Sequence, residues 1–112
     1  MSDRLAIADT SPRGEVLVVA REVAAIVRAV TNDSRYRVFL FGSWVSGRAR
    51  ERSDIDVGIE GPVPVPAAVM QEIREACERL ATLYTVDVVD VGALPCAIRG
   101  TLTSCILDLE EV

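Results

Sequence analysis

Two aspartates, Asp54 and Asp56, stand one residue apart at the start of an apolar segment, where they could bind a metal ion. On a strand successive side chains point to opposite faces, so both carboxylates would share one face, roughly 7 Å apart at their Cα atoms. Alone in a partly buried site, such a pair repels itself and one carboxylate keeps its proton. Proteins usually hold Mg²⁺ with one or two carboxylates, water and substrate phosphates. The pair therefore indicates a divalent-cation site.

A glycine and a serine, Gly42 and Ser43, end the preceding apolar segment and open a short helix. Glycine allows close approach of the backbone, and the N–H groups at a helix start favour an anion such as a phosphate. Arg48, Arg50 and Arg52 follow and could add phosphate contacts. Each feature alone also fits an ordinary turn, a solvated surface or a charged strand edge. Their order and spacing favour a nucleoside triphosphate site.

The elements that must hold these residues alternate between helix and strand. Residues 1–13 lack sustained periodicity, and we expect a flexible N-terminal arm followed by a single domain over residues 14–112. The fold class predicted is α/β (α+β), with a small mixed β-sheet flanked by helices. Apolar spacing predicts helices over 15–30, 67–83 and 95–104, a short helix from Ser43, and strands over 36–42, 54–60, 84–91 and 105–109.

Composition restricts the kinds of partner and chemistry. The 112 residues carry a net charge of −5, which argues against direct binding to duplex nucleic acid. All 12 cationic residues are arginine and histidine is absent, so no imidazole can act as base or ligand. Three cysteines without CxxC spacing are expected to be free thiols of a cytoplasmic protein. The apolar segment Val16–Val30 is interrupted by charges and too short to span a membrane.

The stretch "GSWVSGRARERSDID" resembles the Gly-Ser, spacer, Asp-x-Asp signature of the DNA polymerase β-like nucleotidyltransferase superfamily. The chain is most similar to its minimal nucleotidyltransferases, over roughly Val16 to Val91. This resemblance implies the polymerase β-like palm fold and the transfer of a nucleoside monophosphate to a hydroxyl. It also implies ATP as substrate and Mg²⁺ as cofactor, with two ions in the site.

The resemblance also assigns nucleotide-binding residues. It implies that Gly42 and Ser43 hold the triphosphate, with Arg48 and Ser53 as further nucleotide contacts. The chain departs from the family pattern at Ser46, because many relatives carry an arginine at that position. The departure leaves open whether this phosphate contact has moved to Arg48 or has been lost.

A third carboxylate is implied on the strand that follows the second long helix. This strand offers Asp87 and Asp90, and an interval of three places them on opposite faces, so only one can join Asp54 and Asp56. The family position corresponds to Asp87, whereas Asp90 is expected to be a surface acid at the strand end. Asp54, Asp56 and Asp87 would then be the catalytic and metal-binding residues. Without histidine, Asp87 is the expected proton acceptor for the attacking hydroxyl.

Minimal nucleotidyltransferases resemble this chain in size and are paired with HEPN-domain toxins. The resemblance implies an antitoxin that transfers AMP from ATP to a tyrosine of a HEPN-type toxin. The apolar face of Val16–Val30 would then be buried against the partner, unless it only fills the domain's own core. The alternative is a degenerate module that neutralises its partner by occlusion. Transfer to a small molecule such as an antibiotic is disfavoured because no second domain is evident, and a homo-oligomer remains an option.

Overall fold

The computed structural model describes residues 6–109, and it describes side chains from Gly14 onward. Helices and strands alternate along the chain as the apolar spacing predicts. The helices are α1 (Ala6–Thr31), α2 (Ser43–Ser46), α3 (Ala67–Glu78) and α4 (Cys96–Leu102), with a 3₁₀ turn, η1 (Val91–Ala93), before α4. The strands are β1 (Arg37–Phe41), β2 (Ile55–Glu60), β3 (Val86–Asp90) and β4 (Leu107–Asp108).

The four strands form one mixed sheet in the order β3-β2-β1-β4. β1 pairs with β2 and with β4 in antiparallel fashion, whereas β2 pairs with β3 in parallel. A parallel pair needs a crossover connection, and α3 supplies it between β2 and β3. The predicted fold class, a small mixed sheet flanked by helices, is confirmed.

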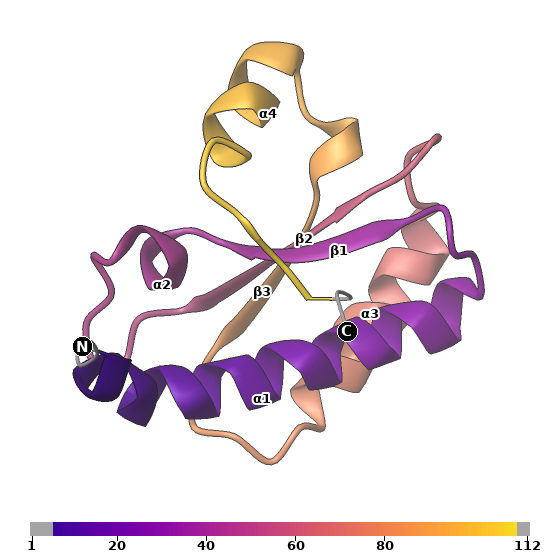
Figure 1. The fold of residues 1–112 in the computed structure, drawn as a ribbon. Helices are drawn as coiled ribbons and strands as arrows, with labels where there is room; N and C mark the ends of the chain where they lie inside the picture. Colours follow the sequence, from indigo (N-terminus) through magenta and orange to yellow (C-terminus); the bar gives the residue numbers. More distant parts are fainter. Residues whose placement is uncertain (1–5, 110–112) are drawn as a thin grey trace.

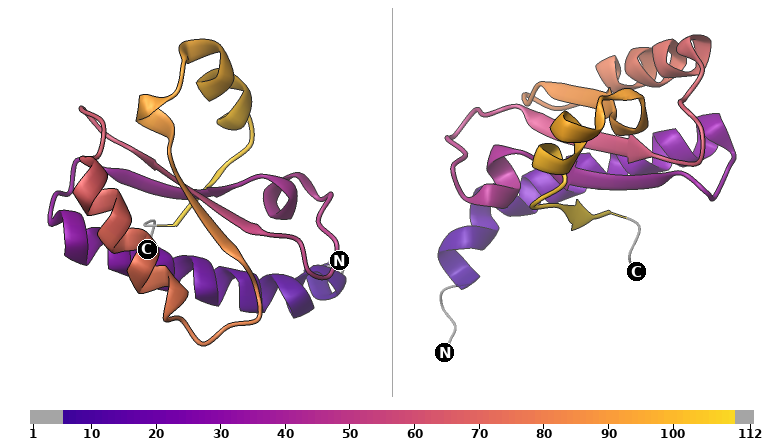
Figure 2. Two further views of the ribbon diagram at one scale, coloured as in Figure 1. Left: turned by 180° about the vertical axis from the view of Figure 1, so that it is seen from behind. Right: turned by 90° about the horizontal axis from the view of Figure 1, so that it is seen from above.

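Helices cover the two faces of the sheet unequally. In Figure 1, α1 and α3 lie side by side across one face, and α4 stands away from the other face. The view from behind in Figure 2 shows the same arrangement. The sheet therefore has a thickly covered face toward α1 and α3 and a thinly covered face toward α4.

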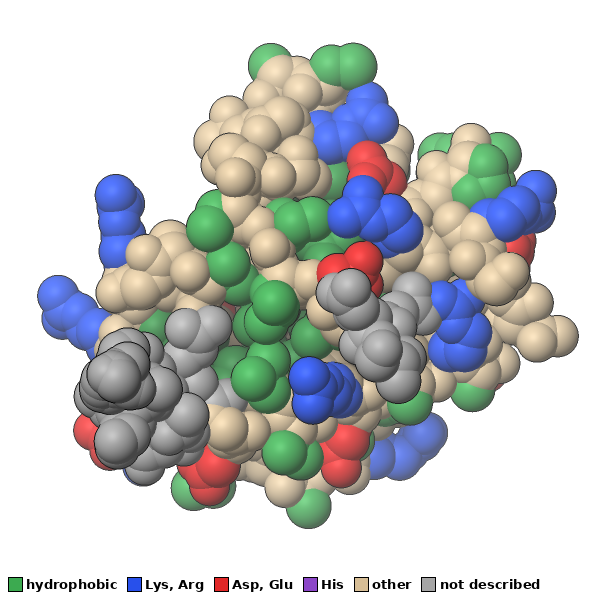
Figure 3. Space-filling model, viewed as in Figure 1, with side chains coloured by type: hydrophobic (Ala, Val, Ile, Leu, Met, Phe, Trp, Pro, Cys, Tyr) green, Lys and Arg blue, Asp and Glu red, His purple; other side chains and the backbone are tan. Residues whose placement is uncertain are grey.

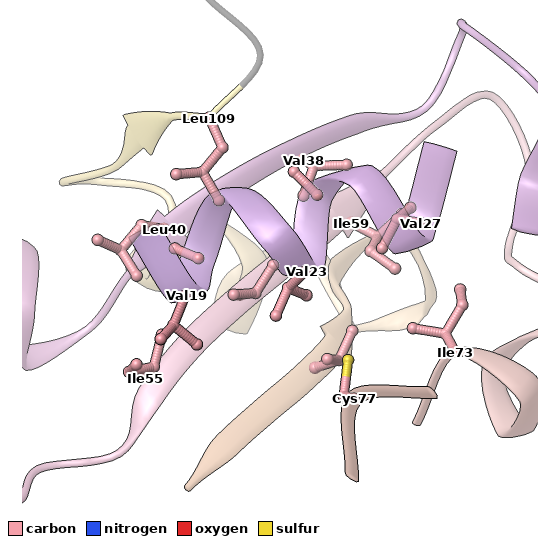
Figure 4. Packing of buried hydrophobic residues seen from close by; sticks show 14 of the residues in the cluster. Val19, Val23, Val27, Val38, Leu40, Ile55, Ile59, Ile73, Cys77 and Leu109 are labelled. Carbon is pink, nitrogen blue, oxygen red and sulfur yellow. The ribbon is translucent and has the colours of Figure 1, made fainter. Parts of the chain in front are cut away.

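The main core fills the space between the sheet and the helices α1 and α3. Alternate residues of the strands point into this layer, where they meet valines from α1 and apolar residues from α3 (Figure 4). Ile55, Val57 and Ile59 of β2 are fully buried there. This alternation forces the residues between them, Asp56 and Gly58, onto the face toward α4.

Two element boundaries differ from the sequence prediction by more than two residues. Helix α1 begins at Ala6, so residues 6–13, which we expected in a flexible arm, lie within a helix. Ala6 and Ala8 have high helix propensity, which the apolar spacing did not register. Residues 1–5 of the expected arm lie outside the described residues, and the domain boundary at residue 14 stays a prediction. Helix α3 ends at Glu78, because the Leu80 N–H returns to Cys77 in a tightened last turn.

The apolar face of α1 mostly serves the protein's own core. Val16, Val19, Val23 and Val27 are buried, whereas Val18 keeps 59% of its surface exposed. The alternative that this face fills the domain's own core describes these four valines, because the sheet and α3 cover them. Burial of the face against a partner stays a prediction. Within the part of the chain that is described, no helix is both long and apolar enough to cross a membrane.

Candidate active site

The thinly covered face of the sheet carries a small second core and the predicted site residues side by side. Phe39 and Phe41 of β1 pack with Val91, and α4 contributes Leu102 to the edge of this cluster. Gly58 of β2 must be small here, because a Cβ atom would clash with the Phe39 ring. The remaining part of this face, at the starts of β2 and β3, holds the carboxylates.

Asp56 and Asp87 are paired directly across the parallel strands β2 and β3. Paired residues share a face of the sheet, so both carboxylates lie on the side away from the main core. Asp54 precedes β2 by one residue and is exposed, as is Asp87, whereas Asp56 is half-buried. The structure therefore brings the three predicted carboxylates to one end of one sheet face.

The electrostatics of Asp56 reflect these neighbours. Burial, together with the charges of Asp87 and Asp54, raises the pKa of Asp56 from its usual 3.8 to about 6. A half-buried carboxylate with two acidic neighbours holds its proton more tightly than a free one. Any nearby positive charge would stabilise the ionised form of this group.

Gly42 lies directly against the Asp56 carboxylate. A Cβ atom built on Gly42 would overlap the Asp56 Oδ2 atom, and its φ of 82° is one that residues with side chains rarely adopt. Both constraints require glycine at the turn between β1 and α2. Ser43 follows as the first residue of α2, and its carbonyl oxygen accepts the backbone N–H groups of Gly47, Arg48 and Ala49. The turn at Gly42 thus lies against one of the predicted carboxylates, Asp56.

A pocket of about 410 Å³ opens at this point, and its far wall was not foreseen from the sequence. The segment around the end of α4 forms that wall, although no motif in it indicates a binding role. In Figure 3, hydrophobic side chains reach the surface between α4 and the α1 side of the molecule. The lining residues are Phe41, Gly42, Ser46, Asp56, Asp87, Val89, Thr101, Leu102, Ser104 and Cys105.

Two predicted nucleotide contacts, Arg48 and Ser53, lie elsewhere in this structure. Neither is among the described residues that line the pocket, and Arg48 is exposed. The Ser53 hydroxyl accepts the backbone N–H of Arg50 at 2.7 Å, so it closes a local turn. Ser46 does line the pocket and so occupies a place from which a longer side chain could reach a ligand. The nucleotide-binding roles of Arg48 and Ser53 stay predictions.

Asp90 points to the opposite face from Asp87, as the alternation on β3 predicts. It is not the surface acid that we expected: its Oδ2 atom accepts a hydrogen bond of 2.8 Å from the Val65 backbone N–H, and its buried Oδ1 atom has no hydrogen-bond partner among the described residues. The reason is the loop between β2 and α3, which folds back over the end of β3. Asp90 therefore holds this loop and stays away from the pocket.

The comparison with protein families decides which kind of domain carries this site. The profile of the nucleotidyltransferase domain matches residues 21–105, a segment that includes β1, α2, β2 and β3. The chain belongs to the nucleotidyltransferase domain family. Gly42, Ser43 and the three aspartates of this nucleotidyltransferase domain all lie inside the matched segment.

A solved structure supports the same fold. The chain is similar to a protein in the crystal structure of a toxin–antitoxin with AMP-PNP, with a TM-score of 0.61 and 18% sequence identity. The match covers 82% of this nucleotidyltransferase domain and 73% of the other chain. No curated protein sequence gave a significant match.

The carboxylates of this nucleotidyltransferase domain fit a divalent cation in chemistry. Their oxygens are hard ligands, and the raised pKa of Asp56 marks a position where positive charge would be stabilising. Among the described residues no three acidic or cysteine side chains already converge on one point. Because Asp54 and Asp87 are exposed, their side chains can rotate toward Asp56 without disturbing the core.

Proposed function

We propose that this protein transfers AMP from ATP to a hydroxyl of a partner protein. The observation that carries the proposal is the contact of the Gly42 turn with Asp56, which is paired with Asp87 in one pocket. This contact supports a position for phosphates beside carboxylates that could hold a divalent cation. The family match supports nucleotidyl transfer as the reaction class.

In the proposed site, Asp54, Asp56 and Asp87 would hold Mg²⁺, two ions in all. Mg²⁺ would neutralise the carboxylates and phosphates and act as a Lewis acid on the reacting phosphoryl group. The turn at Gly42 and Ser43 orients the triphosphate, and Gly42 leaves room for the Asp56 carboxylate because it has no side chain. Leu102 and Val89 give the pocket an apolar wall that restricts water at one side.

The reaction would proceed by in-line displacement at the α-phosphorus. The acceptor oxygen forms a bond to this phosphorus while the bond to the pyrophosphate oxygen breaks. Asp87 takes the proton of the acceptor hydroxyl, since it is exposed to an incoming partner and pairs with Asp56. The products are the AMP-modified acceptor and pyrophosphate.

We further propose that the acceptor is a tyrosine of a HEPN-type toxin, so that the protein acts as an antitoxin. The structurally similar protein belongs to a toxin–antitoxin crystallised with AMP-PNP, which supports both a protein partner and an adenine nucleotide. The exposure of Asp54 and Asp87 supports an acceptor of protein size, because a large partner can approach them without an opening step.

The test is incubation of the purified protein with ATP labelled at the α-phosphate, Mg²⁺ and a HEPN-type protein encoded beside it. We expect label in the HEPN-type protein, a mass increase of one AMP on a tyrosine, and no label with Asp56→Asn. Stable binding without label would support neutralisation by occlusion instead. Label on a small-molecule alcohol but not on the protein would contradict the antitoxin proposal.

A further inference from the structure

Trp44 joins the helix of the Gly-Ser turn to the loop that precedes Asp54. The Trp44 side chain keeps 6% of its surface exposed, and its Nε1–H donates a hydrogen bond of 3.0 Å to the Ser53 carbonyl oxygen. A buried indole N–H needs such a partner. The contact spans nine positions of the chain and links α2 to the residue directly before Asp54.

The loop that receives this hydrogen bond is closed by two hydrogen bonds between Arg50 and Ser53. The Ser53 N–H donates to the Arg50 carbonyl oxygen at 3.1 Å, and the Ser53 hydroxyl accepts from the Arg50 N–H at 2.7 Å. Glu51 and Arg52 at its tip are exposed. Because Ser53 is tied to Arg50, the hydrogen bond from the indole fixes the position of the whole turn.

Both peptide units that flank Asp54 are bound by other segments. The unit before it carries the Ser53 carbonyl, which Trp44 holds. The unit after it carries the Ile55 N–H, which donates to the Thr85 carbonyl oxygen at 2.8 Å. Fixing both peptide planes fixes the two backbone dihedral angles of Asp54 and therefore the direction of its Cα–Cβ bond.

The indole itself is held from the side of β3. The Tyr84 ring meets Trp44 edge-on, with centroids 5.9 Å apart and an interplanar angle of 83°. Such T-shaped pairs are favoured and add to the packing energy. Tyr84 lies three positions before Asp87. The pair of Trp44 and Tyr84 thus connects the loop before Asp54 to the segment before Asp87.

We infer that Trp44 is a positioning residue, which aims the Asp54 carboxylate at Asp56 through its hydrogen bond to the Ser53 carbonyl. This inference rests on the proposed function, because it deepens the description of the same site. It predicts that the indole N–H matters beyond the packing of the ring. The phenylalanine variant keeps an aromatic ring against Tyr84 and removes this N–H.

The experiment compares wild-type protein with Trp44→Phe in two assays. In the first, calorimetric titration with Mn²⁺ alone, we expect the dissociation constant to rise about 10-fold, because one ligand is no longer held in place. In the second, AMP transfer, we expect the Mg²⁺ concentration for half-maximal rate to rise and kcat to fall, while KM for ATP changes little. Trp44→Tyr, which also lacks the indole N–H, should behave as Trp44→Phe does.

The matched control is Ile73→Val, a fully buried residue of α3 that belongs to the same main core as Trp44 but has no side-chain N–H that could hold the loop before Asp54. This variant should lower the melting temperature with no change in Mn²⁺ affinity, since it only removes core packing. An unchanged Mn²⁺ affinity and Mg²⁺ dependence in Trp44→Phe would overturn the inference. If the wild type binds Mn²⁺ yet transfers nothing, the proposed function fails, and the Mn²⁺ comparison still decides the role of Trp44.

Discussion

Asp56 and Asp87 are direct neighbours in the parallel pair of β2 and β3. Neighbouring strands lie about 4.8 Å apart, so two carboxylates at paired positions repel each other when both are ionised. This pair belongs to the regular part of the sheet and depends little on loops. The backbone positions of Asp56 and Asp87 are therefore fixed by the sheet, whereas Asp54 lies just before β2 and is exposed.

The free energy of unfolding should depend on pH through Asp56. Its pKa of about 6 in the folded protein exceeds the usual 3.8, so the folded state binds this proton more tightly than the unfolded chain. The resulting stability is complete below the unfolded pKa and is lost as pH rises through the folded one. Since the group is partly exposed and screened, we expect a loss of about 1 kcal/mol. Asp56→Asn should lack this component, and urea denaturation of both proteins from about pH 4 to about pH 7 would measure it. Parallel pH profiles would contradict the assignment.

Gly42→Ala should abolish transfer and destabilise the protein by about 3 kcal/mol. The new methyl group would meet the Asp56 carboxylate and would also force a strained backbone conformation. Gly47→Ala is the matched control: Gly47 has a similar positive φ of 85°, but no described atom beyond its own chain neighbours lies within 4 Å of its Cβ position. It should cost about 1 kcal/mol and keep activity. Equal loss of transfer in both variants would show that contact with Asp56 is unimportant.

Substitutions at Asp87 and Asp90 should affect different properties: transfer activity for Asp87 and stability for Asp90. Asp87→Asn should remove transfer with little change in the free energy of unfolding, because the side chain is exposed. Asp90→Ala should keep transfer and cost about 2 kcal/mol, because the Val65 N–H loses its acceptor. Transfer rates and chemical denaturation of both variants provide the measurement. The opposite pattern would assign the third carboxylate to Asp90.

Ser46→Arg should lower KM for ATP about 5-fold. Ser46 lines the pocket beside Asp56, and a guanidinium there could form charge-assisted hydrogen bonds with the triphosphate. Ser46→Gln adds length without charge and should leave KM nearly unchanged. Steady-state kinetics at saturating acceptor would compare the three proteins. Equal KM values in both variants would mean that charge at this position does not reach the nucleotide.

Much of the site framework was predictable because it follows from alternation along strands. The spacing of Asp54 and Asp56, and the opposite orientation of Asp87 and Asp90, are properties of a two-residue period. The Gly-Ser turn after β1 was predictable because glycine permits a positive φ there. These features need only local sequence.

The parts that were missed depend on contacts between distant segments. The end of α4 forms a wall of the pocket because it folds back over β1, and nothing in its own sequence encodes that position. The hydrogen bond from Trp44 to Ser53 joins residues nine positions apart, and the one from Val65 to Asp90 joins residues 25 positions apart. The length of α3 was overestimated because apolar spacing continues past its last hydrogen-bonded turn.

The division of Asp87 and Asp90 between the two faces of β3 has a consequence for folding. If β3 slipped by one position against β2, Asp87 would enter the apolar layer beneath α1 and α3, where an unpaired carboxylate is costly. Val65 would lose its acceptor in the same step. Misaligned sheets of this protein are thus penalised twice, which discourages kinetic traps during assembly and leaves one pairing of the central strands as the stable outcome.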